Sequence, residues 1–317
     1  MKTQKCQDPE ELNLIKLAQE YSDEDKARTL LESLRWPSGP TCPHCKAAGS
    51  ECGDIYKIAP DEKSKTRKGL YCCAACRKQF TVTVGTVFEG SHIPISKWLM
   101  AMFIICSSKK SVSAHQLHRM LGITYKTAWF MAHRIRFAME PDGTTKLSGT
   151  VEVDETFVGG KGDRRTKTKR QTPVVALVER GGNMRVKVVA NVTQKNLGQC
   201  LDECVSKGAI VNTDEHGAYR NPLKQWKAHH TVVHSRKEYT RENEDGSLAS
   251  VNSAESFFSL LKRGVVGAWH HVSREHLLKY ASEFAFRWNT RKDSDGERMG
   301  KFVPMIEGKR LTYRQAV

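Results

Sequence analysis

The chain has 317 residues and a strongly basic composition. Lys and Arg number 51 against 35 Asp and Glu, which gives a net charge of +16 at pH 7 and indicates a polyanionic partner such as nucleic acid. No apolar run reaches the roughly 18 residues of a transmembrane helix, and the first residues lack the apolar stretch of a secretory signal, so we expect a cytoplasmic protein with no membrane partner.

The N-terminal segment, residues 1–38, is predicted to be helical. Leu and Ile recur at helical spacing within residues 8–35. Ser22 opens the sequence SDED, which is typical of a helix N-cap. We interpret this segment as a small packing element.

Residues 39–90 predict a zinc ribbon. Cys42 and Cys45 form one C-x-x-C pair and Cys73 and Cys76 form a second, with 27 residues between the pairs. Four thiolates in two such turns form a tetrahedral, closed site for one structural Zn²⁺ ion. The alternative is that these are core or surface cysteines with coincidental spacing. Disulfides are disfavoured, because a cytoplasmic compartment is reducing.

Residues 91–140 predict an apolar helix followed by a helix-turn-helix. Ser113 is expected to cap the first helix of the motif, Gly122 to form the turn, and Thr124 to cap a second helix that runs to about Met139. A recognition helix presents its side chains to DNA. We expect three basic residues of the second helix to do so: Lys126, Arg134 and Arg136. The alternative is a helical pair with a solvated basic face.

Residues 148–292 predict an α/β domain, a mixed sheet flanked by helices. A polar linker at 141–149 precedes an alternating strand, and two further strands are joined by a Gly-Gly-Asn turn. A helix, a strand ending at Asp214, a second helix, a fifth strand in residues 231–239 and a last helix follow. This order of elements is typical of an RNase H-like fold.

Three acidic residues mark the ends of elements in this domain. Asp154 lies in a strand, Asp214 ends another, and Glu255 opens an amphipathic helix on which Lys262 follows two turns later on the same face. Carboxylates from separate elements can hold two divalent ions about 3.5–4 Å apart for phosphoryl transfer. Such ions are Mg²⁺ or Mn²⁺, since hard cations prefer oxygen ligands. Each acid alone could be a cap or a solvated residue, but three in this order favour a metal site.

A run of basic residues follows Asp154. Charge runs are usually solvated loops, but this position next to a metal ligand also suits contact with phosphate, and both interpretations stay open. The DNA contacts predicted on this side of the molecule are Lys161, Arg164, Arg165, Lys262 and Arg263.

Jointly, these motifs resemble those of bacterial insertion-sequence transposases of the DDE type, in the zinc-ribbon group related to eukaryotic Merlin transposons. The matching segments cover nearly all of residues 30–292 and include RWPSGPTCPHC, LGITYKTAWFMAHRIR, VEVDETFVGG, NTDEHGAY and LKRGVVGAWHHVSREHLLKYASEFAFRWNTR. The resemblance implies an RNase H-like catalytic domain, Mg²⁺-dependent strand cleavage and strand transfer, and recognition of terminal inverted repeats.

The same resemblance implies a catalytic set of Asp154, Asp214, Glu255 and Lys262. Some relatives use asparagine as the third residue, and Asn252 lies one turn before Glu255. Glu255 is favoured because a carboxylate is the stronger ligand and because Lys262 has the usual offset from it.

The function predicted from the sequence is that of a transposase which binds terminal inverted repeats and target DNA, at the bacterial nucleoid and as a homo-oligomer of at least two chains. A zinc-ribbon and helix-turn-helix regulator is the alternative, which the three intact acids argue against. An RNase H-like nuclease without transfer activity is disfavoured by the resemblance alone. Residues 293–317 are predicted to be a C-terminal tail.

Overall fold

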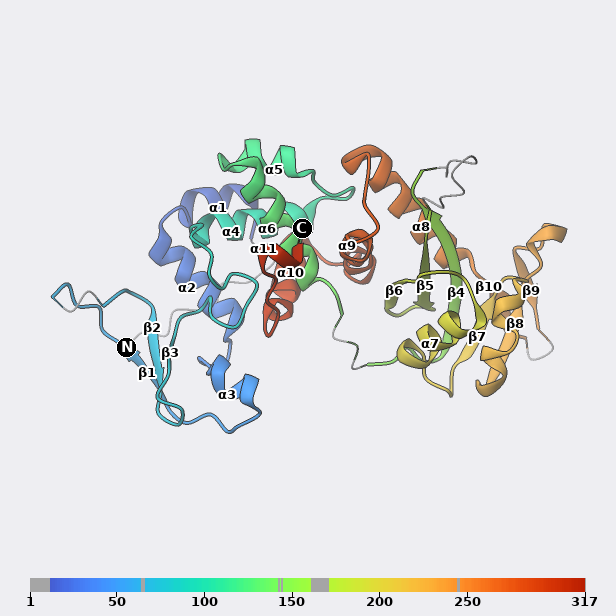
Figure 1. Cartoon of the computed structure of the whole chain (residues 1–317), viewed down its shortest axis with the longest axis horizontal. Helices are drawn as coiled ribbons and strands as arrows, with labels where there is room; N and C mark the ends of the chain where they lie inside the picture. The colour runs from blue at the N-terminus through green and yellow to red at the C-terminus, as the bar shows by residue number, and fades with distance from the viewer. Residues whose placement is uncertain are drawn as a thin grey trace. The chain divides into compact units, whose positions relative to one another are not determined.

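The computed structural model describes residues 12–63, 66–141, 143, 145–160, 171–243 and 246–316. The chain divides into two compact units (Figure 1). The first combines the segment up to Met139 with the segment from Lys292 onwards, and the second spans Glu140–Arg291. Within the described ranges, no helix has both the length and the apolar character needed to cross a membrane.

The first unit begins with two helices and a small antiparallel sheet. Their bounds are α1 Leu14–Glu20, α2 Glu24–Arg35, α3 Pro43–Ala48, β1 Ile55–Ile58, β2 Leu70–Cys73 and β3 Gln79–Phe80, with strand order β1-β2-β3. The N-cap of α2 is Asp23 and not the predicted Ser22, because the Asp23 carboxylate accepts from the backbone N–H groups of Asp25 and Lys26. The Trp36 ring meets Tyr71 and Phe80 edge-on, which joins α2 to the sheet.

The rest of the first unit is helical. Its elements are α4 Ile95–Ser107, α5 Ala114–Leu121, α6 Tyr125–Ala138, α10 Asp295–Phe302, η6 Val303–Ile306 and α11 Tyr313–Ala316. Nine of the 13 residues of α4 are buried, since α1, α2, α6 and α10 all contact this helix. Two helices lie where the helix-turn-helix is predicted, with the predicted caps and turn residue: Ser113 caps α5, Gly122 adopts φ 58°, and Thr124 caps α6.

The C-terminal residues do not form the predicted tail. They belong to the first unit, where α10 contacts α4. Glu307 accepts from Arg35 at 3.3 Å and from Lys46 at 2.7 Å, so the end of the chain is tied to α2 and to α3. The apolar residues Met299, Phe302 and Val303 are fully buried, which is the packing that turns this segment into part of a core.

The second unit is built on a five-stranded mixed sheet, as expected for an RNase H-like fold (Figure 1). The strands are β4 Thr150–Val158, β5 Thr172–Glu179, β6 Met184–Val188, β7 Ile210–Thr213 and β8 Ala228–Thr231, in the order β6-β5-β4-β7-β8. The first three are antiparallel, whereas β4, β7 and β8 are parallel. The fifth strand therefore precedes the predicted 231–239, because the parallel pairing with β7 selects residues 228–231.

Helices cover both faces of this sheet. On one face α7 Gln194–Cys204 buries Leu197, Cys200, Leu201 and Cys204 against alternate residues of β4 and β5. On the other face lie α8 Asn252–Gly264 and α9 Leu277–Asn289, which bury their apolar sides against the intervening residues of the same strands. Gly264 is where these two helices approach closely, since an added Cβ would lie 2.3 Å from the Phe284 ring.

Short elements complete the second unit. They are the 3₁₀ helices η2 Gly217–Tyr219, η3 Pro222–Gln225 and η4 His234–Arg236, the hairpin strands β9 Thr240–Glu242 and β10 Leu248–Ser250, and the π-helical turn η5 Val265–Trp269. Only 3₁₀ turns connect β7 to β8, whereas the element order predicted from the sequence has a full helix there. The hairpin leads directly into α8.

Candidate active site and zinc site

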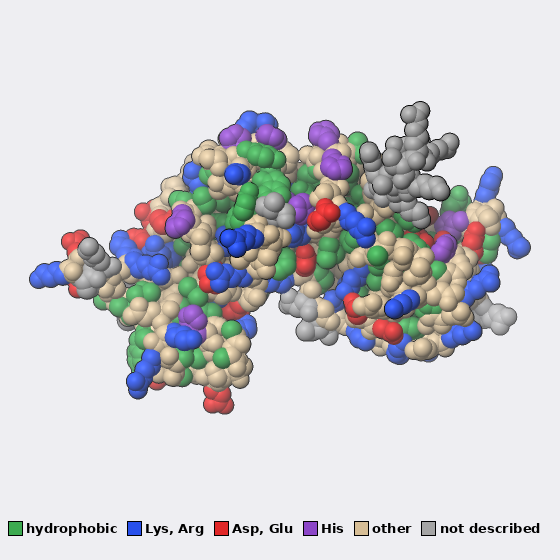
Figure 2. Space-filling model, in the orientation of Figure 1, with side chains coloured by type: hydrophobic (Ala, Val, Ile, Leu, Met, Phe, Trp, Pro, Cys, Tyr) green, Lys and Arg blue, Asp and Glu red, His purple; other side chains and the backbone are tan. Residues whose placement is uncertain are grey.

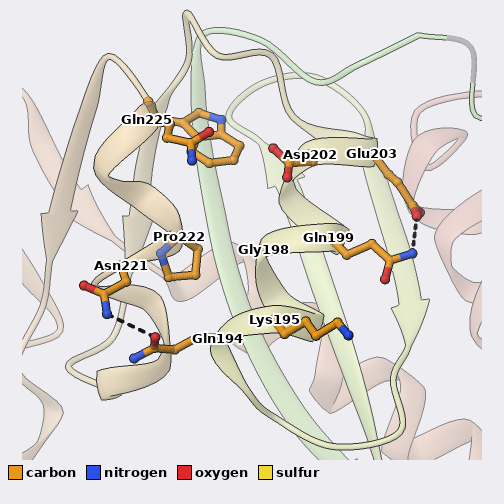
Figure 3. A pocket seen from close by; sticks show the side chains of 10 residues that line it. Gln194, Lys195, Gly198, Gln199, Asp202, Glu203, Asn221, Pro222 and Gln225 are labelled. Carbon is orange, nitrogen blue, oxygen red and sulfur yellow. Dashed lines mark hydrogen bonds between the residues drawn. The ribbon is translucent and has the colours of Figure 1, made fainter.

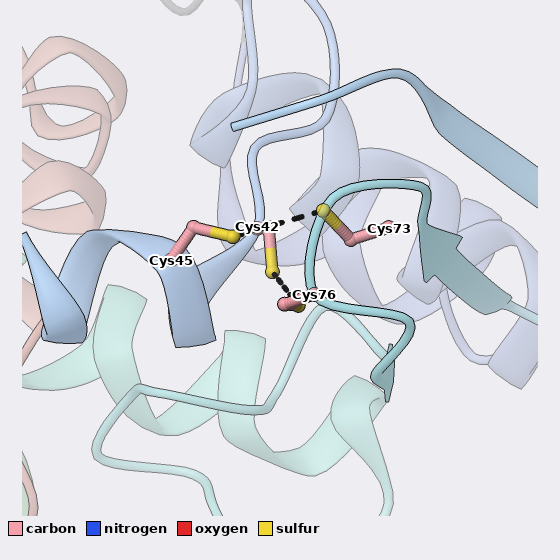
Figure 4. Close-up of side chains that lie close together, drawn as sticks. All are labelled: Cys42, Cys45, Cys73 and Cys76. Atoms are coloured by element: carbon pink, nitrogen blue, oxygen red, sulfur yellow. Dashed lines mark hydrogen bonds between the residues drawn. The ribbon is translucent and has the colours of Figure 1, made fainter. Parts of the chain in front are cut away.

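The four predicted zinc ligands form one cluster in the first unit (Figure 4). Their sulfur atoms all lie within 4.8 Å of one another, with 3.6 Å between Cys42 and Cys76 and 3.7 Å between Cys45 and Cys73. The backbone N–H of Cys76, the main cause, lowers the pKa of Cys73 to about 6. A thiolate that accepts backbone N–H groups within such a turn is a suitable zinc ligand, so the cluster fits a closed structural zinc site.

The sheet brings the two strand acids together. Asp154 lies in β4 and Asp214 follows β7 directly. The parallel ladder pairs Glu152 with Asn212, so two residues further along the same register Asp154 stands beside Asp214. Side chains alternate along β4, and Asp154 falls on the face that α8 covers.

The third acid comes from that helix. Glu255 lies in the first turn of α8, and its side chain is 45% exposed. Asn252 is the first residue of α8 and is also exposed, so it stays the alternative third residue. Lys262 is exposed two turns along the same helix.

Electrostatics link the three acids. The pKa of Asp154 is raised to about 7: burial is the largest cause, and the charges of Asp214 and Glu255 add to it. A hydrogen bond from the Glu155 N–H to Asp154 Oδ1 at 2.8 Å opposes the shift. Like charges that are gathered in one site make each carboxylate harder to ionise. Within the described residues, the three acids do not all lie as close together as the cysteines do.

Sequence reasoning missed a buried acid, Glu155, on the opposite face of β4. Glu155 follows Asp154 and accepts a short hydrogen bond from the Tyr219 hydroxyl, and His216 Nδ1 lies 4.0 Å from its carboxylate. Burial, as the main cause, raises the pKa values of Glu155 and of Tyr219. The sequence did contain a signal for it: Asp154 and Glu155 are adjacent acids in one strand, and adjacent strand residues point to opposite faces of a sheet.

A histidine contacts the third acid. His234 Nδ1 lies 3.7 Å from Glu255 Oε1. The loop that carries His234 is tied to the residue after Asp214, since Glu215 Oε1 accepts from the Ser235 N–H at 3.1 Å. No spacing pattern in the sequence pointed to His234, because the contact spans two separate elements.

Two predicted DNA contacts are wrong. Arg134 and Arg136 are 4% and 1% exposed, so neither can lie against a duplex. Arg134 donates to the Glu89 carbonyl at 2.6 Å and lies over the Trp98 and Phe130 rings, and Arg136 donates to the Val112 carbonyl at 3.1 Å. The two arginines point to different sides of α6, and both are enclosed because residues 131–136 of this helix are buried all round.

The start of α6 differs from its end. Lys126 is exposed there, beside the 44% exposed Tyr125, whose ring stacks on His115 of α5 at 4.2 Å. Lys262 and Arg263 are exposed on α8. The remaining predicted contacts, Lys161, Arg164 and Arg165, lie outside the described residues. Figure 2 shows Lys and Arg side chains spread over the visible surface of both units, with fewer acidic ones between them.

A pocket of about 590 Å³ lies away from the acids, between α7 and η3 (Figure 3). Amide side chains dominate its lining, and Asn221 donates to Gln194 across it at 3.0 Å. None of the three acids reaches this pocket, so we assign it no part in the chemistry.

Comparison with known proteins finds transposase segments in both units. The ISXO2-like transposase domain matches residues 146–289, and the transposase zinc-ribbon domain matches residues 22–79. An uncharacterised protein in transposable element ISH50 of Halobacterium salinarum is 29% identical over 287 residues, which cover 84% of this chain and 91% of that protein. The resemblance seen in the sequence is thereby confirmed: a segment similar to a transposase zinc ribbon precedes a segment similar to an ISXO2-like transposase domain.

Proposed function

We propose that this transposase cleaves DNA at the terminal inverted repeats of its insertion sequence and transfers the freed 3′ end to target DNA. The observation that supports the proposal is electrostatic: Asp154 lies on β4, Asp214 follows β7 and Glu255 is in the first turn of α8, and the charges of Asp214 and Glu255 both raise the pKa of Asp154. Three carboxylates from separate elements are a donor set of hard oxygen atoms, which suits Mg²⁺ or Mn²⁺.

Both chemical steps exchange one phosphorus–oxygen bond for another. In cleavage, the oxygen of water bonds to phosphorus while the bond to the 3′ oxygen breaks, which leaves a 3′-hydroxyl and a 5′-phosphate. In transfer, that hydroxyl attacks a target phosphodiester and displaces a 3′-hydroxyl there. Two divalent ions would stabilise the attacking and the leaving oxygens in each step.

The side chains around the acids have separate tasks. Asp154 and Asp214 would hold the ions from the rigid sheet and Glu255 from the helix, while the exposed Lys262 would offer its positive charge to a nearby phosphate. DNA is the partner that both matched domains imply, and the exposed Tyr125 and Lys126 at the start of α6 are the best placed of the described residues to read it. We expect this to happen at the nucleoid, with at least two chains on the DNA.

The test is cleavage of a duplex that carries the terminal repeat, with Mg²⁺ present. Asp154→Ala, Asp214→Ala and Glu255→Ala should each reduce cleavage by about 10³-fold or more, the range for losing a main source of transition-state stabilisation. DNA affinity and folding should stay near those of the unaltered protein.

Asn252→Ala is the matched variant, because Asn252 lies on the same helix one turn earlier. It should keep most of the activity. If Asn252→Ala lost cleavage and Glu255→Ala kept it, the third residue would be Asn252. Full activity in Asp154→Ala or Asp214→Ala would contradict the proposed site altogether.

A further inference from the structure

Glu152 is a buried carboxylate on β4 that lies outside the catalytic set. Its side chain is 2% exposed, and a buried charge is tolerated only when it is paired and hydrogen-bonded. Oε1 accepts from Arg180 Nη2 at 3.0 Å and from Ser250 Oγ at 3.1 Å, while Oε2 accepts from the Ser253 N–H at 2.8 Å. Both carboxylate oxygens are therefore engaged.

One of these bonds closes the beginning of α8. Ser253 is the second residue of the helix, and the N-cap residue Val251 provides no side-chain hydrogen bond. The first N–H groups of a helix have no partner within it, and a carboxylate there is favoured by both hydrogen bonding and the helix dipole. Glu152 thus provides, from the neighbouring strand, the cap that the local sequence of α8 lacks.

Arg180 extends the connection to the hairpin. It follows β5 and donates to the Leu248 carbonyl at 2.7 Å and to Ser250 Oγ at 3.0 Å. The strand that leads into α8 and the first turn of α8 are therefore held by one ion pair, Glu152 with Arg180.

We propose that Glu152 is a positioning residue of the active site. It lies two residues before Asp154 on the same face of β4, and Glu255 lies two residues after Ser253. By holding the Ser253 amide, Glu152 fixes the distance between the acid on the strand and the acid on the helix. The role in catalysis rests on the proposed function, whereas the attachment of α8 to β4 does not.

Glu152→Gln tests this role in the full-length protein. The variant keeps the size of the side chain, but its NH₂ group must face either the Ser253 N–H or the donors of Arg180, so one donor meets another. Hydrogen exchange of peptides covering residues 251–258 should become faster. Mn²⁺ binding, measured by electron paramagnetic resonance without DNA, should weaken by about 10- to 100-fold, the range for residues that orient metal ligands. Cleavage should need correspondingly more Mn²⁺.

Two control variants separate positioning from general loss of stability. Glu179→Gln changes an adjacent carboxylate, which accepts from Ser148 Oγ at 2.9 Å and does not touch α8. Leu197→Ala creates a cavity on the opposite face of the sheet. Both should leave the Mn²⁺ affinity and the exchange in residues 251–258 unchanged. If Glu152→Gln does not fold, Ser250→Ala removes a single donor and should shift both measurements in the same direction by a smaller amount.

The outcomes distinguish this inference from the proposed function. Two results in Glu152→Gln would overturn the positioning role: unchanged hydrogen exchange in residues 251–258, or faster exchange there with unchanged Mn²⁺ affinity. If Glu152→Gln does not fold, the same results in Ser250→Ala would overturn it. If instead Asp154→Ala kept Mn²⁺ binding and cleavage, the proposed function would be wrong, while faster exchange in Glu152→Gln would still support the attachment of α8 to β4.

Discussion

The zinc site and the acid site collect their ligands in opposite ways. Each pair of cysteines comes from one local turn, and backbone N–H groups lower the pKa of Cys73 to about 6. The acids come from two strands and a helix, and burial together with neighbouring acids raises the pKa of Asp154 to about 7. Burial raises the pKa values of Cys42 and Cys45, so a zinc ion would be needed to hold all four thiolates, and it would stabilise a small fold. The acid site gathers like charges at a cost in stability that divalent ions would offset.

The largest effect should come from breaking the zinc site. Cys73→Ser should abolish binding of one zinc ion per chain and unfold the ribbon, because a closed structural site contributes its binding energy to folding. Residues 146–289 should keep their fold, since they belong to the other unit. Zinc content and hydrogen exchange of the two units measure this. Cys52→Ser is the control, as Cys52 is exposed and outside the cluster. Retention of zinc by Cys73→Ser would contradict the assignment.

The two ends of α6 should respond differently to loss of charge. Arg134→Ala should lower the free energy of unfolding by about 2–3 kcal/mol, because a buried hydrogen bond and two ring contacts are lost. Lys126→Ala should leave stability unchanged and weaken binding to the terminal repeat more than to a scrambled duplex. If Lys126 also contacts a phosphate, the slope of the logarithm of the DNA-binding constant against the logarithm of salt concentration should fall by about 1. Denaturation and binding across a salt series are the measurements. If Lys126→Ala weakened binding to both duplexes equally, α6 would not be the helix that recognises the sequence of the terminal repeat.

The raised pKa of Asp154, caused mainly by burial and also by neighbouring acids, should appear as a pH dependence of stability. The pKa of Asp154 is about 7 in the folded chain against an ordinary value of 3.8, so the folded state holds an extra proton between these values. Without divalent ions, stability should fall as pH rises from about 4 through 7. Asp154→Asn should lack this fall and melt a few degrees above the unaltered protein at pH 8. Identical melting profiles of the two proteins would show that the pKa of Asp154 is not raised in the folded chain.

The smallest effect should come from the contact to Glu255. His234→Ala should raise the Mn²⁺ concentration needed for cleavage by less than about tenfold, since the 3.7 Å contact is weaker than a direct hydrogen bond to a ligand. Titration of cleavage with Mn²⁺ measures this. The neighbouring exposed Ser235 provides the control variant Ser235→Ala, whose backbone N–H still reaches Glu215. If His234→Ala lost as much cleavage activity as Glu255→Ala, His234 would take a direct part in the reaction.

Local sequence determined the features that depend on short spacings. The C-x-x-C pairs predicted the cysteine cluster, the caps Ser113 and Thr124 predicted the bounds of α5 and α6, and strand alternation predicted the RNase H-like sheet. These follow from the sequence because neighbours in the chain interact whatever the distant parts do. Asp23 displaced Ser22 as a cap because both residues are suitable and only the path of the backbone selects between them.

Tertiary structure decided which side of each element faces the protein. Arg134 and Arg136 are as basic as Lys126, but they lie in the second half of α6, which is buried all round, whereas Lys126 lies at its exposed start. The attachment of Glu152 to Ser253 joins residues 101 positions apart and has no local signature. The sequence alone determined the kinds of groups this protein would bring to DNA and to metal ions. Only the packing of α8 on β4 decided which carboxylates meet, because contacts between distant elements depend on how their apolar faces fit together.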